Sequence, residues 1–237
     1  MVILDIETVP INGTELNKYR KYIKNGQVVL LDSIEKVLED RESFKSEVDW
    51  FLKLESINEE ICKCASLNVL IGRIACIGII YKKGKARVET TFYDRESEKN
   101  LLTNFWDYIA EKNLEMKTVT FNGLNFDLPF LYFRSMVHGI DVSWHDFGLR
   151  KFTSFPHFDL MQHLSFWNSF KYVSLDYFAM LFGYDVDPET CDNGSIVSKW
   201  WGCKEDSRIQ SYNLEDCRKT AFLYNKTYKY YPQAPKP

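Results

Sequence analysis

The segment Val2–Thr8 (VILDIET) constrains the fold of this chain more than any other. Apolar residues on both sides of two acids predict a buried strand. Side chains alternate between the two faces of a strand, so Asp5 and Glu7 point the same way. Two neighbouring acids on a core strand lose hydration and repel each other, and a bound cation removes that cost. The alternative is a strand end at which both carboxylates simply reach water.

Length and charge set wide limits on the rest. A chain of 237 residues is long enough for one large domain or two small ones. The net charge of −3 does not point to a nucleic-acid binder. It does not exclude one either, because such a protein needs only a local basic groove and clustered carboxylates lower the total.

The cysteines and the hydropathy indicate the compartment. Six cysteines are too few for a disulfide scaffold of this length, and Cys62 and Cys64 lack a second pair at zinc spacing. We expect reduced thiols and a cytoplasmic location. The N-terminus leads directly into a strand rather than a signal peptide. No apolar run approaches membrane-spanning length, so we expect no membrane partner.

Hydrophobic periodicity predicts the order of the elements. We expect strands at 2–8, 73–81, 86–93 and 117–121, a strand or helix start at 158–161, and helices at 95–113, 126–137, 175–182 and 206–228. A hairpin beside the first strand, followed by alternating helices and strands, predicts an α/β fold with a mixed sheet flanked by helices.

Residues 11–66 form a predicted helical insertion after the first strand, with helices at 14–24 and 33–61. The run 17–24 carries four basic residues between tyrosines. It suits contacts to a nucleic-acid backbone, but a solvated amphipathic helix is the preferred interpretation. The insertion is too short for a core of its own. We therefore expect one domain over 1–230 and a flexible proline-rich tail over 231–237.

Two further segments carry acids on predicted helices. Asp127 lies in the first turn of a helix, shortly after Asn122 and Asn125, at a strand end where α/β proteins place ligand sites. Alone, Asp127 is explained by helix capping. Tyr212 and Asp216 lie four residues apart on the last helix and share a face. Alone, this pair fits an ordinary amphipathic helix.

Together the three segments resemble the exonuclease motifs of the DEDD 3′–5′ exonuclease superfamily, tyrosine subclass. They read D-I-E-T on the first strand, N-x-x-x-F-D at a mid-chain helix and Y-x-x-x-D on the last helix. Their order matches as well, most closely that in stand-alone relatives of the proofreading domain of family B DNA polymerases. The resemblance runs from Val2 to about Tyr228 without the insertion. It implies a ribonuclease H-like fold with a five-stranded sheet.

The resemblance also implies two divalent cations, Mg²⁺ or Mn²⁺, and a ligand set for each. Asp5 would bridge the two ions, and Glu7 and Asp216 would complete the first site. Asp127 would hold the second ion, partly through water. Hard oxygen ligands suit these metals. No lysine is expected near the four carboxylates, which would then repel each other unless metal is present.

Four more residues have implied roles at the substrate. Tyr212 would position the attacking water rather than act as a base, since the ordinary pKa of tyrosine is about 10. Thr8 would place its backbone near the terminal nucleotide. Asn122 and Asn125 would order the second motif and the substrate strand.

The resulting prediction is a metal-dependent 3′–5′ exonuclease that releases nucleoside 5′-monophosphates from 3′ ends of single-stranded DNA. RNA is an alternative substrate, because the motifs recognise phosphate and metal rather than the sugar. The other alternative is a non-catalytic nucleic-acid-binding or adaptor protein on the same scaffold. The chain runs only from the first motif to shortly after the third, so we expect no polymerase domain in it.

Several other residues leave two interpretations open. Asp159 either faces the site from the end of the last strand or caps a helix. Trp200 and Trp201 either stack on bases or pack in the core. His138 and His163 are expected to be ordinary surface or packed side chains, and Asn193-Gly194 indicates a turn.

Overall fold

The computed structural model describes most of the chain outside the insertion. The described residues are 1–11, 65–114, 117–146, 148–153, 155–167, 169–171, 173–186, 194, 196–232 and 234–236. The predicted helices at 14–24 and 33–61, the basic run 17–24, Cys62, Cys64 and Asn193 lie outside them. The expectations for these segments stay predictions.

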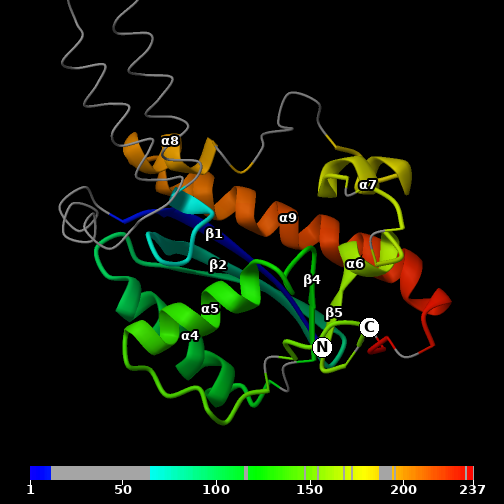
Figure 1. Ribbon diagram of the computed structural model, residues 1–237, viewed down its shortest axis with the longest axis horizontal. Coiled ribbons are helices and arrows are strands. Elements are labelled where there is room, and N and C mark those ends of the chain that lie inside the picture. Colours follow the sequence, from blue (N-terminus) through cyan, green and yellow to red (C-terminus); the bar gives the residue numbers. More distant parts are fainter. Residues whose placement is uncertain are drawn as a thin grey trace, which may run out of the picture.

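A mixed five-stranded sheet forms the centre of the protein, in the order β3-β2-β1-β4-β5 (Figure 1). Its strands are β1 (Val2–Pro10), β2 (Gly72–Lys83), β3 (Ala86–Tyr93), β4 (Thr118–Thr120) and β5 (His157–Asp159). Strand β2 pairs antiparallel with β1 and β3, whereas β1, β4 and β5 are parallel. The predicted sheet of five strands is confirmed.

Helices cover both faces of this sheet, with α4 and α5 on one face and α9 across the other (Figure 1). The α-helices are α4 (Glu98–Glu111), α5 (Asp127–Val137), α6 (Leu160–Leu164), α7 (Leu175–Leu181), α8 (Ile196–Gly202) and α9 (Asp206–Thr227). A 3-10 turn, η3 (Tyr228–Tyr230), follows α9. Among the described residues, no helix carries an apolar stretch long enough to cross a membrane.

The alternation of side chains along β1 determines on which face of the sheet Asp5 and Glu7 lie. Leu4 and Ile6 are buried in the core beside α4 and α5, whereas Ile3 is buried on the opposite side with residues of α9. Asp5 and Glu7 follow Ile3 in the alternation, so they point toward α9. The acids therefore lie under the helix that carries the third sequence motif.

The structure differs from the sequence predictions at three places. Residues 157–164 form both a strand and a helix, whereas one or the other was expected, and α8 was not predicted. In the tail that was expected to be flexible, Pro235 is buried and its carbonyl accepts a hydrogen bond from Tyr224 Oη. The aromatic end of α9 offers an apolar surface, and proline has no N–H to leave unpaired on it.

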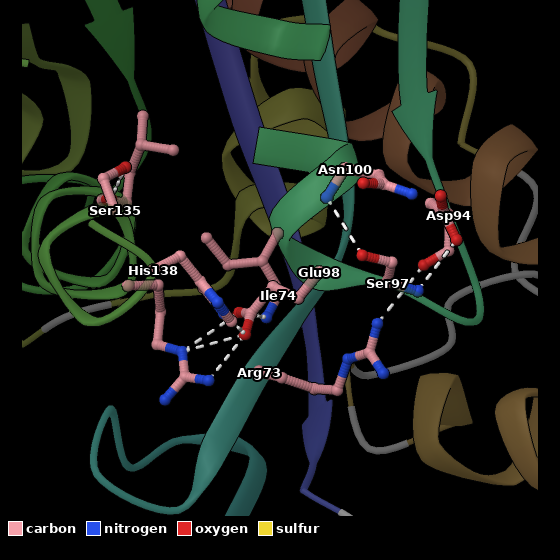
Figure 2. Close-up of polar contacts among 10 residues, drawn as sticks. Arg73, Ile74, Asp94, Ser97, Glu98, Asn100, Ser135 and His138 are labelled. Atoms are coloured by element: carbon pink, nitrogen blue, oxygen red, sulfur yellow. Dashed lines mark hydrogen bonds and ion pairs between the residues drawn. The ribbon is translucent and has the colours of Figure 1, made fainter. Parts of the chain in front are cut away.

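A buried ion-pair cluster around Glu98 joins α4 and α5 to β2. Glu98 Oε1 accepts the Ile74 N–H at 2.6 Å and Arg134 Nε at 3.0 Å, and His138 Nε2 lies 2.7 Å from Oε2. Figure 2 shows Ile74 and His138 meeting the carboxylate of Glu98. Arg134 belongs to α5 and His138 caps its end. The cluster thus fixes the helix that begins at Asp127.

Removal of the Glu98 charge should destabilise the fold. We expect Glu98→Gln to lower the free energy of unfolding at pH 7 by about 3 kcal/mol, because it leaves the buried Arg134 without its counter-ion. Urea denaturation measures this change. Glu111→Gln on the same helix removes an exposed carboxylate and should leave the stability unchanged. Equal effects of the two substitutions would contradict the role of the cluster.

The effect should also depend on pH. Burial raises the pKa of Glu98, but the hydrogen bonds from His138 and Arg134 outweigh it and hold the pKa below its ordinary value. A lowered folded-state pKa stabilises the protein above the ordinary carboxyl pKa of about 4.3, and this contribution disappears as the pH falls through the folded value. Denaturation curves of wild type and Glu98→Gln should therefore converge in acid.

Candidate metal centre

Three of the predicted acids meet in one cluster. Asp5 and Glu7 reach it from β1, and Asp216 reaches it from α9. One oxygen from each lies within 4.8 Å of the others. The segments are more than 200 positions apart in the sequence, so only the packing of α9 on the sheet brings them together. Carboxylate oxygens at this spacing are the donor set that Mg²⁺ and Mn²⁺ prefer.

The fourth acid, Asp127, is fixed beside the cluster by the backbone of β1. The pairing of β1 with β4 ends at Ile3. Further along β1, the Ile6 N–H donates to Asp127 Oδ1 at 3.1 Å. Asp127 is the first residue of α5 and only 3% exposed. It therefore sits next to Asp5, at the position where the neighbouring strand has turned away.

Burial raises the pKa of all four acids, and neighbouring carboxylates raise it further. Burial is the largest cause in each case. It raises the pKa of Asp5 and Glu7 well above the ordinary value, and the neighbouring carboxylates add to it. The pKa rises to about 7 for Asp127 and to about 6 for Asp216. Such shifts indicate carboxylates that lack positive charge, which a divalent cation supplies.

Asn213 orients Asp5 and was not singled out from the sequence. It is fully buried on α9, one residue after Tyr212. Its Nδ2 donates to Asp5 Oδ2 at 2.7 Å. The only signal in the sequence is an amide within a helix, where asparagine is a poor helix former.

Gly78 allows α9 to approach the sheet closely enough for this contact. A Cβ at Gly78 would lie 2.3 Å from Asn213 Oδ1 and 3.0 Å from Cys217 Sγ. Gly78 pairs with Asp5 across the β1–β2 ladder. A glycine inside a strand often marks such a close approach, so this signal was available in the sequence.

Lys219 corrects the expectation that no lysine lies near the acids. Its Nζ is 3.0 Å from Asp216 Oδ1 and 2.5 Å from Asp176 Oδ1. Lys219 follows Asp216 by three residues on α9, so both side chains share one face of the helix. That spacing was readable from the sequence, whereas Asp176 reaches the lysine from a different helix, α7.

Tyr212 lies on the same helix face as Asp216, half-buried beside the acids. Burial raises the pKa of its hydroxyl, and the charges of Asp216 and Glu7 raise it further. Trp200 packs edge-on against its ring at a centroid distance of 5.7 Å. The hydroxyl is therefore neutral at physiological pH, and Trp200 packs against the ring that carries it.

Asp159 caps a helix, as one of its two interpretations predicts, and it also supports the turn before α5. It caps α6 by accepting the Gln162 N–H at 3.1 Å. It also accepts the backbone N–H of Asn122 at 3.1 Å and that of Leu124 at 2.9 Å. These bonds hold the turn that leads into α5, where Asn122 has a φ of 67° that asparagine tolerates.

The three predicted substrate residues make hydrogen bonds within the protein. Asn125 Nδ2 donates to Asn122 Oδ1 at 3.1 Å, so this pair orders its own turn. Thr8 Oγ1 is buried and donates to the Ser66 carbonyl at 2.7 Å. The Thr8 side chain thus ties β1 to the segment before β2, and only its backbone is left for the role that was expected.

The remaining aromatic and histidine candidates are packed side chains. Trp200 and Trp201 both lie against the buried cluster that contains Ile209. The ring of His163 stacks on that of Phe158 at a centroid distance of 3.9 Å. His138 belongs to the Glu98 cluster.

Comparisons with known proteins show the family of this chain. A family model described as "Predicted 3'-5' exonuclease related to the exonuclease domain of PolB" matches residues 66–233. An uncharacterized protein of Methanocaldococcus jannaschii is 30% identical over 167 residues, which cover 70% of this chain and 87% of that protein. The family match begins after β1 and therefore does not include Asp5 and Glu7. These two residues are assigned to the site because their oxygens lie close to Asp216 in the structure.

A solved structure supports the fold. The family B DNA polymerase of the archaeon Pyrobaculum calidifontis is similar with a TM-score of 0.55 and 20% identity. The match covers 69% of this chain and 23% of that one, so the chain spans about a quarter of the polymerase. The expected ribonuclease H-like fold is confirmed.

The close approach of α9 can be tested at Gly78. We expect Gly78→Ala to lower the free energy of unfolding by about 2 kcal/mol, because the added methyl group forces α9 away from β2. Urea denaturation measures the change. Gly202→Ala at the end of α8 meets no atom within 4 Å and should be neutral or slightly stabilising. A Gly78→Ala variant as stable as wild type would show that α9 does not depend on this contact.

Proposed function

Because the chain belongs to the family of predicted 3′–5′ exonucleases related to the exonuclease domain of PolB, we propose that it hydrolyses nucleic acid from the 3′ end. The substrate in this proposal is single-stranded DNA, and the products are nucleoside 5′-monophosphates. One observation carries the proposal. Oxygens of Asp5, Glu7 and Asp216 converge within 4.8 Å, next to the buried Asp127.

The donor set fits two divalent cations, Mg²⁺ or Mn²⁺. Asp5, Glu7 and Asp216 would hold one ion, and Asp5 and Asp127 would hold the other. When bound, two such ions activate a water and stabilise charge on the attacking and leaving oxygens of the phosphodiester. All the proposed ligands are carboxylates, and burial beside other carboxylates raises the pKa of each.

The chain's own groups fix these carboxylates before any ligand arrives. The Ile6 N–H holds one oxygen of Asp127, and Asn213 holds one oxygen of Asp5. Lys219 holds one oxygen of Asp216. Three of the four acids thus have a set orientation, and such preorganisation is what a site for in-line phosphoryl transfer requires.

Tyr212 would orient the attacking water as a neutral hydroxyl. Its raised pKa argues against a phenolate acting as base. A hydroxyl that donates or accepts a hydrogen bond beside Asp216 can direct the water toward the phosphorus atom.

The substrate strand would lie over the turn before α5. Asn125 is exposed there and is held by Asn122, so its amide is available to the sugar-phosphate backbone. The Thr8 backbone would meet the terminal nucleotide from β1. These contacts recognise backbone rather than base, which suits an enzyme that removes nucleotides in any sequence.

Removal of single carboxylates tests the proposal. With Mn²⁺ and DNA carrying a labelled single-stranded 3′ tail, we expect Asp5→Asn and Asp127→Asn each to lower the rate about a thousandfold. The reason is that each loss removes several kcal/mol of transition-state stabilisation by a bound ion. Asp107→Asn on the exposed side of α4 is the matched control and should keep full activity.

Two outcomes would contradict the proposal. One is degradation that persists in both Asp5→Asn and Asp127→Asn, which would assign the activity to another site. The other is a wild-type protein that binds the DNA but never shortens it, as a non-catalytic adaptor would. Matched RNA in the same assay decides the sugar preference.

Tyr212→Phe separates orientation from metal binding. We expect kcat to fall about a hundredfold while KM and Mn²⁺ affinity stay within about twofold of wild type, because the water loses its hydrogen bond while every proposed metal ligand keeps its charge. Steady-state kinetics measure kcat and KM, and calorimetry measures the Mn²⁺ affinity. A variant that instead loses its affinity for Mn²⁺ would show that Tyr212 supports the acids rather than the water.

A further inference from the structure

A buried ammonium group lies at the edge of the acid cluster. Lys219 is only 4% exposed, although it belongs to the central part of α9. Its Nζ lies 3.0 Å from Asp216 Oδ1 and 2.5 Å from Asp176 Oδ1. A lysine this deeply buried is rare unless it is paired, and here it has two carboxylate partners.

The second partner comes from outside the proposed metal site. Asp176 stands in the first turn of α7, and its side chain is 19% exposed. Helix α7 packs directly on α9. Asp176 is not one of the four proposed metal ligands. Its contact with Lys219 therefore serves to hold the ammonium against Asp216.

If Lys219 served only to join α7 to α9, its ion pair with Asp176 would be sufficient. The ammonium instead also binds an oxygen of a proposed metal ligand. A positive charge at that position competes with a cation for the same carboxylate and repels it at short range. The ion pair of Lys219 with Asp176 therefore lies where it can change the metal affinity of the acid cluster.

We propose that Lys219, held by Asp176, is a positioning residue that fixes Asp216 and sets the divalent-cation affinity of the site. This inference rests on the proposed function, since it takes the acid cluster as the metal site. The lysine supplies part of the positive charge that the acids need when no metal is bound. It also prevents the site from binding metal as tightly as the four acids alone would.

The first expected consequence concerns metal affinity. Lys219→Met keeps the length of the side chain and removes its charge. We expect it to bind Mn²⁺ about tenfold more tightly than wild type in 0.1 M salt, the size of effect that one nearby charge exerts on a dication in a partly hydrated site. Lys219→Arg keeps the charge and should stay within about threefold of wild type.

The second expected consequence concerns the protein without metal. Lys219→Met should lower the melting temperature in EDTA, because the acids lose their internal counter-charge. Saturating Mn²⁺ should then raise the melting temperature more in Lys219→Met than in wild type, since the cation replaces the missing charge. A purely structural lysine would lower both melting temperatures equally.

Isothermal titration calorimetry of the full chain with MnCl₂ tests the inference, with thermal unfolding beside it. Lys226→Met is the matched control, because it removes an exposed lysine two turns further along α9 and should leave the affinity unchanged. Tighter binding by Lys219→Met alone supports the inference. Equal affinities of wild type, Lys219→Met and Lys226→Met would overturn it and leave the proposed function standing.

Two other results would also overturn the inference. Weaker Mn²⁺ binding by Lys219→Met would mean that the lysine helps to build the metal site instead of limiting it. A wild-type protein that binds no Mn²⁺ would refute both the inference and the proposed function.

Discussion

The free-energy cost of packing four carboxylates together is the constraint on which the rest of the structure depends. Each buried charge costs several kcal/mol in lost hydration, and repulsion adds to it. The protein offsets part of this cost with three donors, the Ile6 N–H, the Asn213 amide and Lys219. Hydrogen bonds to charged groups contribute only about 1.5–3 kcal/mol each. The raised pKa values of all four acids show that the compensation is incomplete.

Residues far from the acids determine where the acids lie. On one face of the sheet, the Glu98 cluster fixes α5 to β2 and thereby sets the position of Asp127. On the other face, the missing side chain of Gly78 lets α9 lie close enough to deliver Asn213 and Asp216. The Glu98 cluster and the close contact at Gly78 both act through β2. Strand β2 pairs with the whole length of β1, the strand that carries Asp5 and Glu7. The site is therefore a product of the sheet rather than of any single loop.

Hydrophobic periodicity was sufficient to predict most of the strands and helices, whereas the convergence of the acids was predicted only from the resemblance to the DEDD exonucleases. Alternation in β1 fixes the shared face of Asp5 and Glu7, and the four-residue spacing on α9 fixes that of Tyr212 and Asp216. Contacts between separate helices leave no such local signal. The pairing of Asp176 with Lys219 depends on how α7 packs on α9, and the packing of Pro235 depends on Tyr224, so neither was predictable from spacing.

Anomalous diffraction from a crystal soaked in MnCl₂ tests the central claim most directly. The account predicts two manganese peaks, one among Asp5, Glu7 and Asp216 and one between Asp5 and Asp127. Manganese bound elsewhere, with none at these four acids, would contradict it.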